Sequence, residues 1–147
     1  MTYPIQTVST ADYPAITEVW EASVRATHHF LTEENIQYFK PLILEQYLDA
    51  VELRCIKDEE GNLLAFSGVA EGNLEMLFVH PGSFGQGLGK QLLQVAIQNL
   101  GVSKVDVNEQ NPQAVGFYQK QGFAVVSRSE KDGTGKPYPI LHMELKD

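Results

Sequence analysis

A glycine-rich segment, residues 80–90 with the sequence HPGSFGQGLGK, constrains the fold of this chain more than any other feature. An apolar run ends at Pro81 and a helical pattern of apolar residues begins at Leu88, so the glycines lie where a strand gives way to a helix. Glycine adopts positive φ and lets a ligand approach the backbone, so several amides can point at one spot. Together with the positive end of the helix dipole, these amides form a site for phosphate oxygens.

Charge makes such a local site necessary for any anionic cofactor. The formal net charge of -8 disfavours nucleic acid, which requires clustered Lys and Arg, and favours cationic substrates such as amines. Backbone amides, helped by the neighbouring Lys90, can outweigh this repulsive field locally. The alternative is a glycine-rich turn that only connects strand and helix.

Two other phosphate-binding motifs fail on spacing. A P-loop requires a glycine where this chain has Phe84, and Ser or Thr where Gln91 follows Lys90. A dinucleotide fingerprint requires Gly-x-Gly-x-x-Gly, whereas this loop has Gly-x-Gly-x-Gly and no clear acidic ribose ligand downstream. An unrelated nucleotide-binding domain is therefore disfavoured.

The remaining patterns predict a single α/β (α+β) domain over residues 1–147, with the order βααβββαβαββ. Ser9 or Thr10 caps the first predicted helix, and Thr32 caps a second that reaches Phe39 and resumes after Pro41. Asn111 caps a later helix with Pro112 in its first position, and Gly101 ends the helix before it. The predicted strands are residues 3–8, 51–57, 63–70, 74–80, 104–108, 123–129 and 138–145.

Compartment and membrane association follow from what the sequence lacks. No apolar stretch is long enough to cross a membrane, and the N-terminus has no secretory signal pattern. The single cysteine, Cys55, cannot form an internal disulfide, and its apolar surroundings favour a buried small residue over a nucleophile. We expect a cytoplasmic protein.

Two segments carry a family resemblance. Residues 77–81, 85–90 and 92–93 resemble the acetyl-CoA-binding motif of the GNAT superfamily of N-acetyltransferases, and residues 108–118 with 122–123 resemble its second motif. The order of predicted elements matches over nearly the whole chain. The segment ATHHFL and the closing Pro137-Tyr138-Pro139 are similar to the small bacterial YjaB-type acetyltransferases. One position departs from the pattern, because Phe84 stands where the family usually has Arg or Gln.

The resemblance implies a fold, a cofactor and a reaction. The fold is a mixed, mostly antiparallel central sheet of six to seven strands with helices on both faces. The reaction moves an acetyl group from acetyl-CoA to a primary amine by direct attack in a ternary complex. The implied coenzyme contacts are the strand edge Phe78 and Val79, the loop residues Phe84, Gly85, Gln86, Gly87, Leu88, Gly89 and Lys90, and Asn111, Phe117 and Tyr118.

Three side chains are candidates for proton transfer. The resemblance assigns Tyr118 as the acid that protonates the departing thiolate; the alternative is an aromatic residue of the core. The base that deprotonates the amine is Glu75, if the sheet face that it shares with Leu77 and Val79 is the cleft, or His28. A solvated carboxylate and a packed histidine are the corresponding alternatives.

The acceptor site is the least constrained part of the prediction. Candidates for its wall are His29, Phe30, Asn108 and Tyr138, with Glu109 and His142 as weaker ones. No metal is expected, because the adjacent His28 and His29 lack ligand spacing. The acceptor is a small amine, a peptide N-terminus or a protein lysine, and the chain is a monomer or homodimer. The competing hypothesis is a non-catalytic acyl-CoA-binding or sensor domain.

Overall fold

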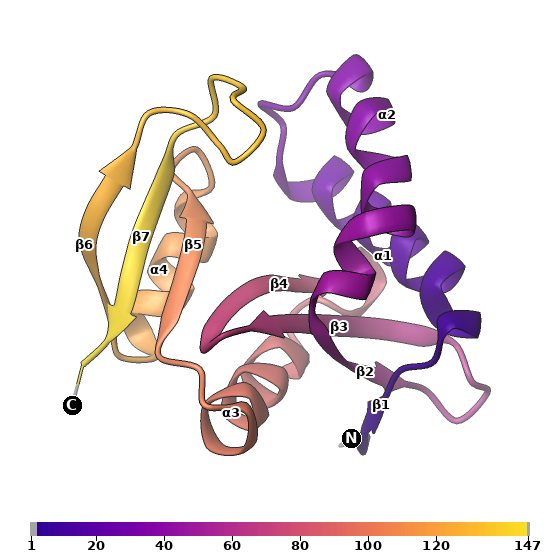
Figure 1. Ribbon diagram of the computed structural model, residues 1–147. Helices are drawn as coiled ribbons and strands as arrows, with labels where there is room; N and C mark the ends of the chain where they lie inside the picture. The colour runs from indigo at the N-terminus through magenta and orange to yellow at the C-terminus, as the bar shows by residue number, and fades with distance from the viewer. Residues whose placement is uncertain (1–2, 147) are drawn as a thin grey trace.

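A seven-stranded sheet with helices on both faces organises the computed structural model, which describes residues 3–146 (Figure 1). The strand order is β1-β2-β3-β4-β5-β7-β6, and all neighbours are antiparallel except β4 and β5. This arrangement confirms the predicted fold class and element order. The strands are β1 (Ile5–Thr7), β2 (Glu52–Lys57), β3 (Leu63–Ala70), β4 (Asn73–Val79), β5 (Lys104–Asn108), β6 (Phe123–Ser129) and β7 (Ile140–Leu145).

Four main helices form the outer layers. α1 (Tyr13–Thr27) and α2 (Glu33–Leu42) cover one face of the N-terminal half of the sheet. α3 (Leu88–Leu100) and α4 (Pro112–Lys120) pack together on the opposite face. Two predicted caps are present: Thr32 Oγ1 accepts from the Asn35 N–H at 3.1 Å, and Asn111 Oδ1 accepts from the Ala114 N–H at 3.3 Å. The predicted cap of the first helix at Ser9 or Thr10 is wrong, because Asp12 is the N-cap residue of α1.

The N-terminal helical region differs from the prediction at two points. A short 3-10 helix, Thr10–Asp12, precedes α1. The expected interruption at Pro41 is wrong, because α2 passes through Pro41 and continues as a π-turn (Ile43–Tyr47) and a 3-10 turn (Leu48–Ala50). An internal proline costs one backbone hydrogen bond, and here Ile43 and Leu48 are buried in the same core as α1, which keeps the segment helical.

The two halves of the sheet separate between β4 and β5. Register pairs join Asn73 to Lys104 and Leu74 to Val105, and within residues 3–146 these strands have no further pair. From residue 75 to residue 79 the β4 edge therefore faces the gap rather than a neighbouring strand, while its other edge pairs with β3. An unpaired strand edge offers backbone N–H and C=O groups to a ligand.

The core packs on both sides of the sheet. Trp20, Leu48 and Phe66 belong to the cluster under α1 and α2, whereas Leu93 and Met143 belong to the cluster under α3 and α4. Cys55 is buried in the first cluster, and burial raises the pKa of its thiol, as expected for a packing residue. Among the helices of residues 3–146, none has the length and apolar character needed to cross a bilayer.

Candidate active site

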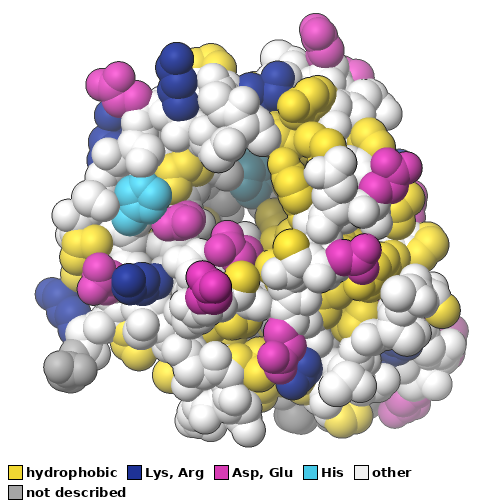
Figure 2. All heavy atoms as spheres, in the orientation of Figure 1, with side chains coloured by type: hydrophobic (Ala, Val, Ile, Leu, Met, Phe, Trp, Pro, Cys, Tyr) yellow, Lys and Arg dark blue, Asp and Glu magenta, His cyan; other side chains and the backbone are white. Residues whose placement is uncertain are grey.

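The gap between the two halves of the sheet opens into a cavity of about 540 Å³. Figure 2 shows it as a hollow in the middle of this face. Its walls come from α1, from the helical segment after Thr32, from β4 and from the ends of β5 and β7. Most of the lining side chains are apolar or aromatic: Trp20, Val24, Leu31, Phe39, Ile43, Tyr47, Val51, Met76, Phe78, Tyr138 and Ile140.

A few polar groups interrupt this apolar lining. Glu75 from β4, His28 from the end of α1 and Asn108 from the end of β5 all line the cavity, so three of the predicted site residues meet there. Desolvation raises the pKa of Glu75, and the Asp106 carboxylate raises it further. A carboxylate with a raised pKa accepts a proton more readily than an ordinary glutamate does.

Glu75 reaches the cavity because β4 contains a β-bulge. Opposite β3, Gly68 pairs with Met76 while the next residue, Val69, pairs with Leu74, so Glu75 is an extra residue in β4. The expectation that Glu75 shares a sheet face with Leu77 and Val79 is therefore wrong. Leu77 and Val79 pack toward α3, whereas Glu75 lines the cavity together with Met76 and Phe78.

His28 is buried, with 8% of its surface exposed, at the point where α1 ends. Burial lowers its pKa to about 4, with a smaller contribution from the neighbouring His29. The ring is therefore neutral at physiological pH and a poor base for an ammonium group. This property favours Glu75 over His28 as the group that takes the proton.

The other predicted wall residues separate into two groups. Tyr138 is buried, lines the cavity and hydrogen-bonds through its hydroxyl to Asn35 of α2. Phe30 lies outside the lining and packs on Tyr138, with ring centroids 5.6 Å apart. His29 is exposed and faces a smaller cavity of about 280 Å³ between α1 and α2.

The glycine loop has the backbone that the sequence predicts. Gly85 and Gly87 have φ of 81° and 78°, in the left-handed region that favours glycine. Gly87 is the N-cap of α3 and contributes no side-chain cap, so the first amides of this helix are not covered by a capping side chain. Phe84, Gln86 and Lys90 are exposed around the loop, and Leu88 is buried beneath it.

Tyr118 lies on α4 behind the gap and not in the cavity wall. Its ring is buried and packs edge-on against Phe117 and Phe123, with centroids 5.1 and 5.8 Å away. Burial raises the pKa of this phenol well above its usual value, so it remains protonated. A Cβ placed on Gly89 would lie 3.9 Å from Phe117 Cζ and 3.8 Å from Val79 Cγ2, which puts the α3 N-terminus beside both β4 and α4.

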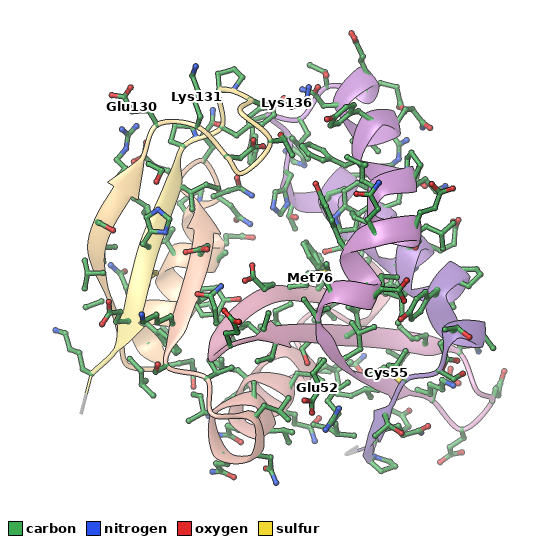
Figure 3. The ribbon with its side chains drawn as sticks, viewed as in Figure 1. Glu52, Cys55, Met76, Glu130, Lys131 and Lys136 are labelled. Atoms are coloured by element: carbon green, nitrogen blue, oxygen red, sulfur yellow. The ribbon has the colours of Figure 1, made fainter. Side chains whose placement is uncertain are left out.

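The loop between β6 and β7 supplies a wall that the sequence did not reveal. Asp132, Gly133 and Thr134 line the cavity, and Asp132 Oδ1 shapes the loop by accepting from the N–H groups of Thr134 (2.9 Å) and Lys136 (3.0 Å). Lys136 Nζ lies 4.3 Å from the centroid of the Tyr38 ring on α2. Figure 3 shows Lys136 on this loop beside α2, and Met76 on β4 facing the gap. The sequence indicated only a turn here, because these contacts join residues about 100 positions apart.

Glu109, a weaker candidate, is engaged elsewhere. Its carboxylate pairs with the Arg128 guanidinium on β6, with Oε2 2.6 Å from Nε, and it does not line the cavity.

Comparison with known proteins assigns this arrangement to a family. A family model described as an acetyltransferase (GNAT) domain matches residues 23–146. The chain belongs to the GNAT family of acetyltransferases. Membership confirms the predicted acetyl-CoA-dependent N-acetyltransferase.

Individual relatives agree with this assignment. The chain is 38% identical over 125 residues to the peptidyl-lysine N-acetyltransferase YjaB of Salmonella typhimurium, covering 85% of this chain and 86% of that protein. It is 32% identical to the peptidyl-lysine N-acetyltransferase YiaC of Escherichia coli, covering 93% and 94%. The solution structure of apo-form YjaB from Escherichia coli matches with a TM-score of 0.86 at 33% identity, covering 98% and 97%. The predicted similarity to YjaB-type GNAT enzymes is confirmed, and a non-catalytic acyl-CoA sensor is not favoured.

Proposed function

We propose that this GNAT enzyme acetylates the side-chain amine of lysine in proteins or peptides. The observation that carries the proposal is the cavity of about 540 Å³, which combines a mostly apolar lining with a carboxylate on β4. The relatives named as peptidyl-lysine N-acetyltransferases support the same acceptor.

The cavity suits a lysine side chain in two respects. Lysine carries a long apolar stem that packs on apolar and aromatic walls, here Trp20, Phe39 and Phe78 among others. Its ammonium group is attracted to aromatic faces and to a carboxylate, which Glu75 supplies. The acidic chain as a whole, with net charge -8, attracts such cationic substrates at long range.

Acetyl-CoA binds on the other side of β4 in this proposal. The amides of residues 85–90 and the N-terminus of α3 hold the diphosphate, since both present backbone N–H groups and a positive dipole end. The pantetheine arm lies along the unpaired edge of β4, where Phe78 and Val79 provide backbone hydrogen bonds. The thioester then lies in the gap, between the coenzyme loop and the acceptor cavity.

The chemistry follows from the groups around the gap. Glu75 takes a proton from the ammonium, and the neutral amine attacks the thioester carbonyl, forming the N–C bond. The oxygen of the tetrahedral intermediate accepts from a backbone N–H of the β4 edge. The C–S bond then breaks, and the thiolate receives a proton from Tyr118. The second proton that the nitrogen releases as the amide forms goes to the phenolate, which restores the phenol. Burial raises the pKa of the Tyr118 phenol, so this group still carries its proton when the thiolate leaves.

A peptide assay tests the acceptor. The protein is incubated with acetyl-CoA and three acceptors: a peptide with one lysine and a blocked N-terminus, the same peptide with norleucine for lysine and a free N-terminus, and the polyamine spermidine. Mass spectrometry should show one added acetyl group on the lysine peptide, and only when acetyl-CoA is present. Acetylation confined to the free N-terminus or to spermidine would refute the lysine proposal while leaving acetyl transfer intact.

A further inference from the structure

A hydrogen-bond chain at the end of α1 fixes which nitrogen of His28 carries the proton. Thr27 Oγ1 lies 2.8 Å from the backbone oxygen of Ser23 and 2.7 Å from His28 Nδ1. The Ser23 carbonyl only accepts, so the single hydroxyl proton of Thr27 must be donated to it. The other contact of Oγ1 then requires Nδ1 to be the donor. In the opposite tautomer Thr27 Oγ1 and His28 Nδ1 would face each other as two acceptors at 2.7 Å with no proton between them.

The second ring nitrogen is therefore left with a lone pair. His28 is neutral, because burial holds its pKa near 4, so Nε2 accepts rather than donates. Among residues 3–146, two buried side-chain polar atoms have no hydrogen-bond partner, Ser67 Oγ and Asn73 Nδ2. His28 Nε2 does not belong to this set of inaccessible, unpaired atoms. The buried ring lines the cavity of about 540 Å³ and also the smaller one between α1 and α2, so Nε2 is reached from these cavities.

We propose that Thr27 is a positioning residue: it holds His28 in the Nδ1–H tautomer, so that Nε2 accepts a hydrogen bond from the acceptor amine. The proposal rests on the proposed function for the identity of the amine. A neutral primary amine has two N–H groups and one lone pair. When Glu75 and His28 accept from the two N–H groups, the lone pair is left to point at the thioester. A weak base suits this task, because it does not take the proton that Glu75 must receive.

The tautomer is measured without turnover. Two-bond ¹⁵N–¹H correlation spectra distinguish the tautomers of the four histidines, and the His28→Gln variant identifies the His28 signals. The wild type and Thr27→Ser should show the Nδ1–H pattern, whereas Thr27→Val, which has no hydroxyl, should lose it. Thr17→Val is the matched control, because Thr17 Oγ1 makes the same kind of bond in the same helix, to the Tyr13 carbonyl at 2.9 Å, with no histidine attached. An Nε2–H pattern in the wild type would overturn the proposal, even should Thr27→Val fail to fold.

Kinetics test the contact with the amine. Thr27→Val should raise KM for the lysine peptide about tenfold, the loss expected for one hydrogen bond, with kcat less affected. Thr27→Ser should restore KM, and Thr17→Val should leave it unchanged. A changed tautomer with an unchanged KM would overturn the role of Nε2. A wild type that acetylates no amine would instead refute the proposed function, and the wild-type spectrum would still decide the tautomer.

Discussion

Acidification should weaken this protein through His28, and the effect can be isolated with one substitution. In the folded state burial lowers the pKa of His28 from 6.5 to about 4. The unfolded chain exposes the ring, which then takes up a proton as the pH falls through 6.5. Between these values the unfolded state binds a proton that the folded state does not, so the free energy of unfolding decreases with falling pH.

The magnitude follows from the width of the window. Each pH unit between 6.5 and about 4 is worth 1.36 kcal/mol, so the full loss is about 3 kcal/mol. The stability that depends on neutral His28 is fully present above pH 6.5 and decreases as the pH falls to about 4. It has then been lost, and His28 causes no further change below that pH. A loss of this size is a large part of the stability of a domain of this length, which is about 5–15 kcal/mol.

Urea unfolding of the wild type and His28→Gln, at several pH values from 7.5 to 4, measures this loss. The carboxylates also titrate in the lower part of this range, but they are the same in both proteins and cancel in the difference. The stability of the wild type relative to His28→Gln should fall by about 3 kcal/mol across the window. A difference that does not change with pH would refute the buried, neutral state of His28.

Three substitutions probe the remaining parts of the mechanism. Tyr118→Phe should slow turnover about a hundredfold and leave coenzyme A affinity unchanged in calorimetry; an equal rate under single-turnover conditions would remove the acid role. Glu75→Gln should lower kcat/KM and abolish the fall of kcat/KM at acidic pH. In the wild type the midpoint of this fall lies above the usual pKa of a glutamate, because desolvation raises the pKa of Glu75; a fall that persists in the variant would assign it to another group. Phe84→Arg places a guanidinium on an exposed position beside the diphosphate loop and should tighten coenzyme A binding several-fold while leaving acetyl-pantetheine, which lacks the diphosphate, unaffected; weaker coenzyme binding would contradict the placement of the loop.

Local chemistry explains what the sequence revealed. Thr32, Gly101 and Asn111 end or begin helices through side-chain or backbone preferences that involve only a few neighbouring residues, and all three are caps in the structure. The left-handed glycines at 85 and 87 are of the same kind. These features can be predicted because their causes lie within one turn of chain.

Tertiary contacts explain what the sequence did not reveal. The bulge that turns Glu75 into the cavity depends on the register between β3 and β4, which no alternation pattern specifies. Asp132 reaches the cavity because Tyr138 and Lys136, on the same loop, contact Asn35 and Tyr38 of α2. The neutral state of His28 likewise depends on burial by several elements and not on its neighbours in sequence.

Binding of a bisubstrate ligand tests most directly whether the two substrates meet across β4. In this ligand, coenzyme A is joined through an acetyl bridge to the side-chain nitrogen of a lysine peptide. If the glycine loop and the acceptor cavity open onto the same gap, linkage makes the second contact intramolecular, and calorimetry should give a Kd at least about a hundredfold below that of coenzyme A. A Kd equal to that of coenzyme A alone would show that the cavity and the loop do not serve one reaction.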